Sequence, residues 1–479
     1  MKTIERIRQI AEKSPLLPAY RYQDRTLCYG ELWHTASELA DALRAMGCGT
    51  CVLYGGKEPE MPTAILGCLM GGVTYVPISD TTPAERLRRI LSACCADCVI
   101  STRAPRTDAL PWLTLTELLS GKYAVPSDCA ISQTAYIIFT SGSTGEPKGV
   151  PISRENLDHF TGWISSLPPL SAESCCKVLN QANFSFDLSV ADLYYALCNG
   201  HMLLALDPAL TSDPAGLHNF WKNSGINVAV CTPTFLKLCL TDPEFSASGI
   251  PSLRTVYSCG ERLDSALAAR LLHRFPDLSL INAYGPTEAT SAVCAVTITK
   301  EMTEAELLPA GELSTAACEI VIDEGEIVLK GKSVFSGYLD SVKGGWFLEN
   351  GKNCYRTGDL GKIQEGYLYC IGRMDRQIKW KGYRIELDEI EHVMSTLPGV
   401  QSCAVVAKHA PSGEVRAIKA YVVPTEEEDR YAVSGREQAL RILLADKLPP
   451  YMLPKTIEYV DALPVNANGK TDRKELEKR

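Results

Sequence analysis

The chain has 479 residues, of which 46% are hydrophobic and 22% are charged, and its formal net charge is -9. This composition is typical of a globular protein and excludes collagen-like, disordered and membrane-spanning chains, and the acidic balance argues against a protein that wraps nucleic acid. Because the length exceeds what one hydrophobic core usually organises, we expect two or three subdomains.

The N-terminal segment predicts an amphipathic helix. Ile4, Ile7 and Ile10 or Ala11 share one face among charged residues, a pattern unlike the hydrophobic region of a signal peptide. No apolar run reaches the roughly 20 residues that a membrane-spanning helix needs. We therefore expect a cytoplasmic protein that does not insert into membranes, and we expect a monomer.

Helices then alternate with short apolar strands, which is typical of doubly wound α/β sheets. The expected elements are helix 31–46, strand 51–54, helix 60–70, strand 98–101, strand 227–230, helix 264–274 and strand 278–281. This alternation predicts that the first part of the chain is one large α/β domain.

Two later changes of pattern divide the chain further. Glycine-rich sequence with hairpin spacing from about 310 to 371 predicts a small antiparallel β subdomain. A small α+β domain follows, with helices expected at 386–396 and 436–446 and strands at 402–407 and 415–423. We place the boundary at Asp375, so that a large N-terminal domain (1–375) precedes a small C-terminal domain (376–479).

The most informative segment is an apolar strand, Tyr136–Phe139, that runs into a loop of glycine and hydroxyl residues with one lysine. Glycines let backbone N–H groups converge on an anion, and hydroxyls and a lysine add donors and charge, so the loop is suited to phosphates. It does not have the Walker order, because Lys148 follows Pro147 and precedes Gly149. The alternative is a flexible surface hairpin. The candidate phosphate ligands are Thr140, Ser141, Gly142, Ser143, Thr144, Gly145 and Lys148.

This loop, Thr140–Val150, closely resembles the phosphate loop of the adenylate-forming superfamily. Further motifs resemble those of the superfamily in the same order along essentially the whole chain: Leu27–Leu32, Gly72–Pro77, Asn282–Glu288, Tyr355–Asp359, Gly372–Asp375 and Asn466–Lys470. The resemblance implies an ATP- and Mg²⁺-dependent enzyme that joins a carboxylate to AMP, releases pyrophosphate and passes the acyl group to a thiol.

The resemblance also assigns roles to residues, and each suits the chemistry of acyl adenylation. A carboxylate that attacks ATP is repelled by the phosphate charge, so the site must neutralise and align both partners. Lys470 would be the catalytic lysine, Glu288 would hold Mg²⁺, Asp359 would bind the ribose hydroxyls and Asp375 would be the hinge. The further implied nucleotide ligands are Asn282, Ala283, Tyr284, Gly285, Pro286, Thr287 and Arg373.

The acid that is activated depends on Asp187, which lies in the apolar segment Phe184–Val190. A carboxylate in such a setting is costly without a partner, and a substrate ammonium group would satisfy it. The alternative is that Asp187 caps the N-terminus of a helix. In amino-acid-activating members of the superfamily an Asp at this place binds the amine. The pocket residues implied are Asp187, Leu188, Ala191, Cys231, Tyr257, Cys259, Ala283 and Ser291, with Lys470 at the substrate carboxylate.

Within the superfamily the sequence is most similar to the D-alanine:D-alanyl carrier protein ligases, whose reaction is linked to lipoteichoic acid in the cell wall. The similarity rests on Phe184–Val190, on Cys259-Gly260-Glu261 and on Asn282–Ala289. By this resemblance Cys259 would crowd the α-carbon and favour the D-isomer. Ser291 departs from the pattern of these ligases, as do Ala191 and Tyr257.

We expect the acceptor to be a separate phosphopantetheine-bearing carrier protein, because the sequence ends nine residues after Lys470. A basic stretch around the hinge is a candidate contact for an acidic carrier, or else a solvated face with nucleotide contacts. Its members are Arg373, Arg376, Lys379, Lys381 and Arg384.

Other functions remain open at this point. The chain could be a stand-alone adenylation enzyme of the nonribosomal-peptide type for another small amino acid, or an acyl-CoA ligase. A third alternative is an inactive zinc-binding or scaffold protein, because Cys48/Cys51 and Cys95/Cys98 form two CxxC pairs. With nineteen cysteines and no export signal, however, reduced thiols that pack as small hydrophobes are the simpler interpretation.

Overall fold

The computed structural model describes residues 1–102, 112–121, 131–142, 146–340, 344–410, 415–425, 433–465 and 471–479. The chain divides into two compact units. The first comprises Met1–Asp80, Cys94–Ile138 and Gly149–Met374, and the second comprises Thr81–Ala93, Phe139–Lys148 and Asp375–Arg479. The predicted domain boundary at Asp375 stays a prediction.

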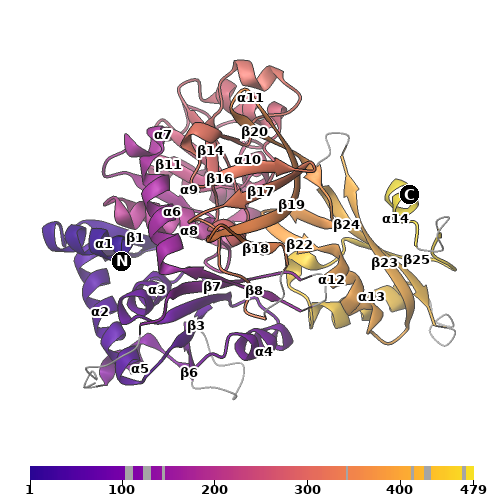
Figure 1. Cartoon of the computed structure of the whole chain (residues 1–479), viewed down its shortest axis with the longest axis horizontal. Coiled ribbons are helices and arrows are strands. Elements are labelled where there is room, and N and C mark those ends of the chain that lie inside the picture. The colour runs from indigo at the N-terminus through magenta and orange to yellow at the C-terminus, as the bar shows by residue number, and fades with distance from the viewer. Residues whose placement is uncertain are drawn as a thin grey trace. The chain divides into compact units, whose positions relative to one another are not determined.

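The first unit is built around an eight-stranded sheet (Figure 1). Its strands follow the order β14 (Cys294–Thr297), β13 (Ser279–Tyr284), β12 (Thr255–Ser258), β11 (Val228–Cys231), β9 (Lys177–Asn180), β10 (Met202–Ala205), β1 (Pro18–Tyr22) and β2 (Arg25–Cys28). Its pairs are parallel except at the two edges, where β13 with β14 and β1 with β2 are antiparallel. This mostly parallel sheet with helical connections confirms the predicted α/β class.

A second sheet contains the strands expected near the N-terminus. Its order is β6 (Trp112–Leu113), β5 (Cys98–Ser101), β3 (Thr50–Gly55), β4 (Thr74–Ser79), β7 (Thr134–Thr140) and β8 (Lys148–Ser153). The helices of the first unit are α1 (Lys2–Lys13), α2 (Tyr29–Ala45), α3 (Glu60–Gly71), α5 (Leu115–Ser120), α6 (Arg154–Ser166), α7 (Pro168–Ser171), α8 (Leu188–Cys198), α9 (Pro214–Ser224), α10 (Pro233–Cys239) and α11 (Ser265–Arg274).

The third sheet is the predicted antiparallel subdomain. Its order is β15 (Gly311–Glu312), β20 (Tyr367–Arg373), β19 (Lys352–Gln364), β17 (Glu326–Lys330) and β16 (Glu319–Asp323), with β18 (Trp346–Glu349) paired to β19. The register of β19 with β20 sets Asp359 opposite Arg373. Two motifs that are separate in the sequence therefore meet on adjacent strands.

The second unit is a small α+β assembly, as the sequence predicts. Its strands are β21 (Gln377–Trp380) paired with β22 (Tyr383–Glu386), and β23 (Val400–His409), β24 (Val415–Pro424) and β25 (Thr456–Tyr459) in a second sheet. Its helices are α4 (Ala84–Ala93), α12 (Leu387–Ser395), α13 (Val433–Ala445) and α14 (Arg473–Lys478).

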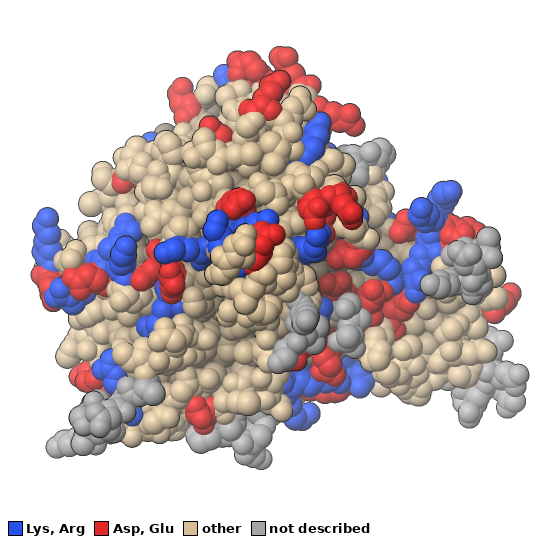
Figure 2. Space-filling model, in the orientation of Figure 1, with Lys and Arg blue, Asp and Glu red and all other residues tan. Residues whose placement is uncertain are grey.

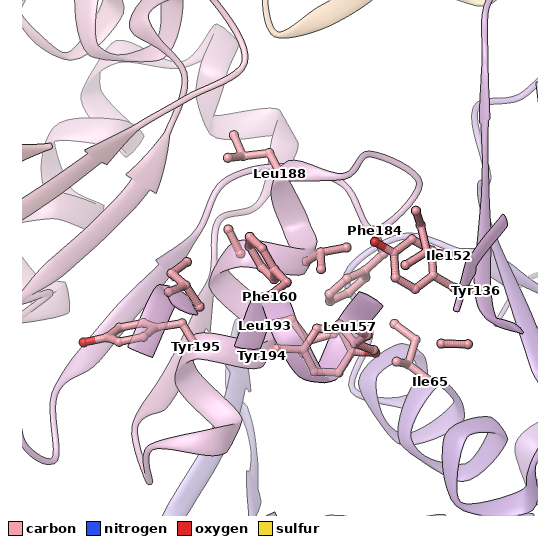
Figure 3. Packing of buried hydrophobic residues seen from close by; sticks show 14 of the residues in the cluster. Ile65, Tyr136, Ile152, Leu157, Phe160, Phe184, Leu188, Leu193, Tyr194 and Tyr195 are labelled. Atoms are coloured by element: carbon pink, nitrogen blue, oxygen red, sulfur yellow. The ribbon is translucent and has the colours of Figure 1, made fainter. Parts of the chain in front are cut away.

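The core of the first unit is organised around α8, because all eleven residues of this helix are buried. Figure 3 shows Leu193, Tyr194 and Tyr195 of α8 among residues of this cluster. One charged side chain, Asp192, is buried with them. A helix that is apolar all round belongs in the middle of a core, so α8 is a rigid base for the segment that precedes it.

At the N-terminus the helix forms as predicted, but its buried face differs. Thr3, Ile7 and Ala11 are buried, whereas Ile4 and Ile10 are half-buried against the core. Thr3 fits there because its hydroxyl donates to Asp158 at 2.7 Å, which satisfies a polar group inside the protein.

Charged side chains of both signs are interspersed on the face of the molecule seen in Figure 2. Among the described residues, no helix combines the length and the apolar character needed to cross a bilayer.

Candidate functional site

The loop between β13 and β14 carries several of the predicted site residues. It begins at Tyr284, passes through a short 3-10 helix, Thr287–Ala289, and returns where the amide of Val293 donates to the carbonyl of Tyr284 at 2.8 Å. A Cβ at Gly285 would collide with the backbone of Ala292, so this return requires glycine. The loop therefore holds Tyr284, Thr287 and Glu288 in a fixed order close to one another.

Tyr284 meets the predicted ribose residue. Its hydroxyl donates to Oδ2 of Asp359 at 2.7 Å, and Nη1 of Arg373 pairs with Oδ1 at 2.6 Å. Arg373 is held in turn, because its Nη2 donates to the carbonyl of Thr357 at 3.2 Å. An ionised carboxylate has about four acceptor positions, so Asp359 can still accept from ribose hydroxyls while two protein groups orient it.

Burial acts on Tyr284 in a way that suits this role. The side chain is 7% exposed, and burial, helped by the charge of Asp359, raises its pKa well above the usual value. The phenol therefore stays protonated at physiological pH and remains a donor to Asp359.

Glu288, the predicted magnesium ligand, is completely buried at 0% exposure. Tyr338 donates to its Oε1 at 2.6 Å, and the amide of Phe335 donates to its carbonyl oxygen at 2.8 Å. The ring of Phe335 packs edge-on against the ring of Tyr338, with centroids 4.9 Å apart. Glu288 is thus an oriented carboxylate, the kind of hard oxygen ligand that Mg²⁺ prefers.

The donor set around Glu288 fits this ion. Within the described part of the chain, no group of three or more His, Cys, Asp or Glu side chains is arranged to hold a metal ion. Mg²⁺ is usually held by one or two carboxylates together with substrate phosphates and water, rather than by a cage of protein ligands. A single oriented carboxylate is therefore compatible with the predicted Mg²⁺ site.

Asp187 occupies the N-cap position of α8, but its side chain makes no capping bond. The carboxylate instead accepts a hydrogen bond from Thr287 Oγ1 at 2.6 Å. The alternative that the Asp187 side chain caps the helix is therefore wrong, because the carboxylate is turned toward the loop of β13 and β14. This contact joins the predicted amine ligand to the predicted nucleotide motif.

Buried hydroxyl groups accompany Asp187. Tyr136 and Tyr257 are both 0% exposed, and their hydroxyls have no hydrogen-bond partner among the described residues. Burial raises the pKa of both, and the charge of Asp187 contributes to each increase. Buried hydroxyls are nearly always paired with protein or with ordered water, so these two can bond water or a polar ligand.

The other predicted pocket residues are also buried. They are Leu188, Ala191, Cys231, Cys259, Ala283 and Ser291. Ser291 has a left-handed backbone, with φ of 72°, and its hydroxyl has no partner among the described residues. No sequence pattern predicts this conformation, which accompanies the tight return from Gly285.

The predicted phosphate loop lies in the second unit. Ser141 Oγ donates to the carbonyl of Arg384 at 2.9 Å, and the amide of Gly142 donates to a carboxylate oxygen of Glu389 at 3.0 Å. Both contacts are made within the protein, and the predicted role of the loop in binding phosphate stays a prediction. Thr140 is buried at the end of β7, and Lys148 begins β8. Ser143, Thr144, Gly145 and Lys470 lie outside the described residues.

Two members of the basic stretch are engaged in ion pairs. Arg373 pairs with Asp359, and Arg376 pairs with Asp388 and with Glu391. A contact with a carrier protein stays a prediction for this stretch.

The cysteine pairs come together only in part. Cys98 Sγ lies 3.7 Å from that of Cys48 and 3.6 Å from that of Cys51, whereas Cys95 is exposed on a turn with φ of 49°. The described residues contain no disulfide. The two CxxC pairs therefore do not supply four sulfurs to one point.

Sequence reasoning missed one residue of the site, Tyr338, and one contact made by a predicted residue, Thr287. Tyr338 orients Glu288 from 50 positions away, and no spacing or motif connects the two. The hydroxyl of Thr287, which the sequence assigned to the nucleotide, bonds Asp187 across 100 positions. Only the folded chain reveals these two contacts.

Comparison with known proteins gives one consistent result. Residues 7–339 match the family described as AMP-binding enzyme, and residues 389–470 match the AMP-binding enzyme C-terminal domain. The chain is 36% identical to the D-alanine–D-alanyl carrier protein ligase of Bacillus licheniformis, over 99% of both chains. It is 38% identical to the ligase of the same name from Listeria monocytogenes serotype 4b, over 99% of this chain and 98% of the other.

Among solved structures, the fold is similar to that of the Vibrio cholerae adenylation domain AlmE in complex with glycyl-adenosine-5'-phosphate. The TM-score is 0.84 and the sequence identity is 26%, over 100% of this chain and 97% of the other.

Proposed function

Because the chain belongs to the AMP-binding enzyme family, we propose that it activates D-alanine as the aminoacyl adenylate and transfers it to the phosphopantetheine thiol of a carrier protein. The observation that carries this proposal is the 2.6 Å hydrogen bond between Thr287 and Asp187, which sets a carboxylate for the substrate amine beside the nucleotide motif. The names of the relatives at 36% and 38% identity support D-alanine as the amino acid.

The first half-reaction forms the adenylate. The substrate carboxylate attacks the α-phosphorus of ATP, a P–O bond breaks and pyrophosphate leaves. Asp187 binds the substrate ammonium group, and Asp359, oriented by Tyr284 and Arg373, binds the ribose. Both contacts align the reactants and reduce the entropy that the reaction must lose. Mg²⁺ held by Glu288 would neutralise phosphate charge, and Lys470 would stabilise the charge that develops between carboxylate and α-phosphate.

The second half-reaction makes the thioester. The carrier thiol attacks the adenylate carbonyl, loses its proton, and AMP leaves. The resemblance to the superfamily suggests that the small domain rotates about Asp375 between the two steps, so that Lys470 serves only the first. The division of the chain between Met374 and Asp375 supports a hinge at this place.

The test is amino-acid-dependent exchange of pyrophosphate into ATP, measured with D-alanine, L-alanine, glycine, serine, cysteine and a fatty acid. We expect the strongest exchange with D-alanine, followed by loading of a phosphopantetheinylated carrier. Exchange with a fatty acid alone would contradict the proposal and favour an acyl-CoA ligase. Zinc binding without any exchange would favour an inactive scaffold.

A second candidate is activation of another small amino acid, glycine above all. The similarity to AlmE with its bound glycyl adenylate, together with the departures at Ala191, Tyr257 and Ser291, favours it. The same panel separates the two candidates, because a pocket that excludes a methyl group discriminates by about 1–3 kcal/mol.

Two substitutions test the assigned roles. Asp187→Asn keeps an acceptor for Thr287 but loses the charge, and we expect the KM for the amino acid to rise about ten- to a hundredfold, since hydrogen bonds to charged groups contribute about 1.5–3 kcal/mol. Lys470→Ala should abolish adenylation, while Lys474→Ala, an exposed lysine of α14, serves as the control. Normal exchange by the Lys470 variant would contradict the mechanism.

A further inference from the structure

The first unit contains a buried charged pair that the proposed reaction does not use. Lys57, between β3 and α3, is 1% exposed, and Asp192 of α8 is 0% exposed. Asn180 joins them, because its Oδ1 accepts from Nζ of Lys57 and its Nδ2 donates to Oδ2 of Asp192 at 2.8 Å. An ammonium group only donates and a carboxylate only accepts, so this orientation of the amide satisfies both.

The same ammonium group bonds the chain just ahead of Asp187. Nζ of Lys57 donates to the backbone carbonyls of Asn180, at 3.3 Å, and of Ala182. It also lies 5.3 Å from the centroid of the Phe184 ring, within the range of a cation–π contact. One side chain therefore contacts three residues of the segment that runs from the end of β9 to Asp187.

Lys57 and the segment that it contacts are both held in place by the surrounding fold. The hydroxyl of Tyr20 donates to the backbone carbonyl of Lys57 at 2.6 Å, which fixes the base of the lysine. Phe184 and Leu188, which lie on either side of Asp187 in the sequence, are both buried in the core cluster (Figure 3). Asp187 is thus the charged member of a segment that is held at each end.

Electrostatics link the two charges. Burial lowers the pKa of Lys57, and the charge of Asp192 opposes that change. Burial raises the pKa of Asp192, and the charge of Lys57 opposes that change. Removal of one charge leaves the other buried without compensation, whereas removal of both keeps the core neutral.

We propose that Lys57 is a positioning residue, which sets the place of Asp187 through its bonds to Asn180 and to the backbone of Ala182. The inference rests on the proposed function, in which Asp187 binds the substrate amine. Its effect falls on the amino acid rather than on ATP, because Lys57 contacts the segment before Asp187, whereas Tyr284 and Asp359 belong to β13 and β19. A small displacement of a binding group is enough to weaken an aligned reaction.

The test compares three variants of the full chain. Lys57→Met removes the donor and leaves Asp192 uncompensated, and Lys57→Met/Asp192→Asn removes the donor but keeps the core neutral. Leu267→Ala, in a different core cluster, is a control for general loss of stability. For each variant, the KM for ATP and for the best amino acid of the exchange panel are measured, together with the melting temperature.

We expect both Lys57 variants to raise the KM for the amino acid about ten- to a hundredfold, with a clearly smaller change in the KM for ATP. The double variant should recover melting temperature but not amino-acid binding. If Lys57→Met does not fold, the double variant decides the question alone. Recovery of amino-acid KM in the double variant, or a uniform loss like that of Leu267→Ala, would overturn the positioning role.

The outcomes also separate this inference from the proposed function. If the parent chain shows no exchange with any amino acid, the proposed function fails, and the role of Lys57 fails with it. If the parent is active and neither Lys57 variant changes the amino-acid KM, only the positioning role is overturned.

Discussion

Tyr284 and Asp359 are joined by a hydrogen bond of 2.7 Å, although 75 positions separate them in the sequence. The bond is buried, and it orients the Asp359 carboxylate, which binds the ribose of ATP in the proposed mechanism.

The first prediction concerns this bond. Tyr284→Phe keeps the ring but removes the hydroxyl that donates to Oδ2 of Asp359. The ion pair between Arg373 and Oδ1 remains. Since a hydrogen bond to a charged group contributes about 1.5–3 kcal/mol, the KM for ATP should rise about ten- to a hundredfold in the exchange assay. Tyr195→Phe is the control, because its hydroxyl bonds the carbonyl of Leu170 in the core. An unchanged KM for ATP would show that Tyr284 does not orient Asp359.

The second prediction concerns Tyr338 and Glu288. Tyr338→Phe removes the donor to a fully buried carboxylate. Groups that orient a metal ligand typically affect affinity or activity by about 10–100-fold, so half-maximal exchange should require a correspondingly higher Mg²⁺ concentration. The assay is a Mg²⁺ titration at saturating ATP and amino acid. Equal Mg²⁺ curves for parent and variant would remove Tyr338 from the metal site.

The third prediction concerns the choice of isomer. If Cys259 crowds the α-carbon, Cys259→Ala should reduce the preference for D- over L-alanine. One methyl-sized contact contributes about 1–3 kcal/mol to such discrimination, and the loss should not exceed that amount. The ratio of kcat/KM for the two isomers measures it. Cys239→Ala, a buried cysteine of α10, should leave that ratio unchanged. A constant ratio in the Cys259 variant would assign the preference to other pocket residues.

The fourth prediction concerns acid stability. His201 is 1% exposed, and burial lowers its pKa from 6.5 to about 4, so the folded protein holds it neutral. As pH falls, His201 is protonated in the unfolded chain before it is protonated in the folded protein. Between about pH 6.5 and 4 this difference lowers the free energy of unfolding by about 3 kcal/mol. His201→Asn keeps an acceptor for the amide of Cys176, which donates to Nδ1 at 3.4 Å.

Urea unfolding at pH 7.5 and at pH 4.5 checks this effect. The difference in stability between parent and His201→Asn should shrink, or change sign, at the lower pH. A difference that stays constant with pH would mean that His201 does not titrate as its burial requires.

Local pattern was sufficient for most of the fold. Strand 51–54 became Thr50–Gly55 and helix 264–274 became Ser265–Arg274, because apolar periodicity and turn residues act within a few positions. The buried face of α1 was harder to predict, since Thr3 is buried only because Asp158 accepts its hydroxyl. Asp158 lies in α6, far along the chain, so the sequence around the N-terminus alone does not predict this contact.

The site divides in the same way. Roles for motif residues such as Glu288 and Asp359 could be predicted from their resemblance to family motifs, but the groups that orient them come from distant segments. Tyr338 donates to Glu288 from the connection between β17 and β18. Thr287 donates to Asp187, whose side chain does not cap α8. These contacts depend on how sheets and loops pack, and a hydrogen bond between distant residues leaves no periodic trace in the sequence.

The rigid return between β13 and β14 has a consequence for how the two substrates bind. One short stretch, whose tight return Gly285 allows, carries three of the contacts described above. Tyr284 bonds Asp359, Thr287 bonds Asp187, and Glu288 bonds Tyr338. A shift of this stretch that improves one contact must move the others. Occupancy by ATP should therefore change the affinity for the amino acid, and by thermodynamic linkage the amino acid should change the affinity for ATP by the same factor.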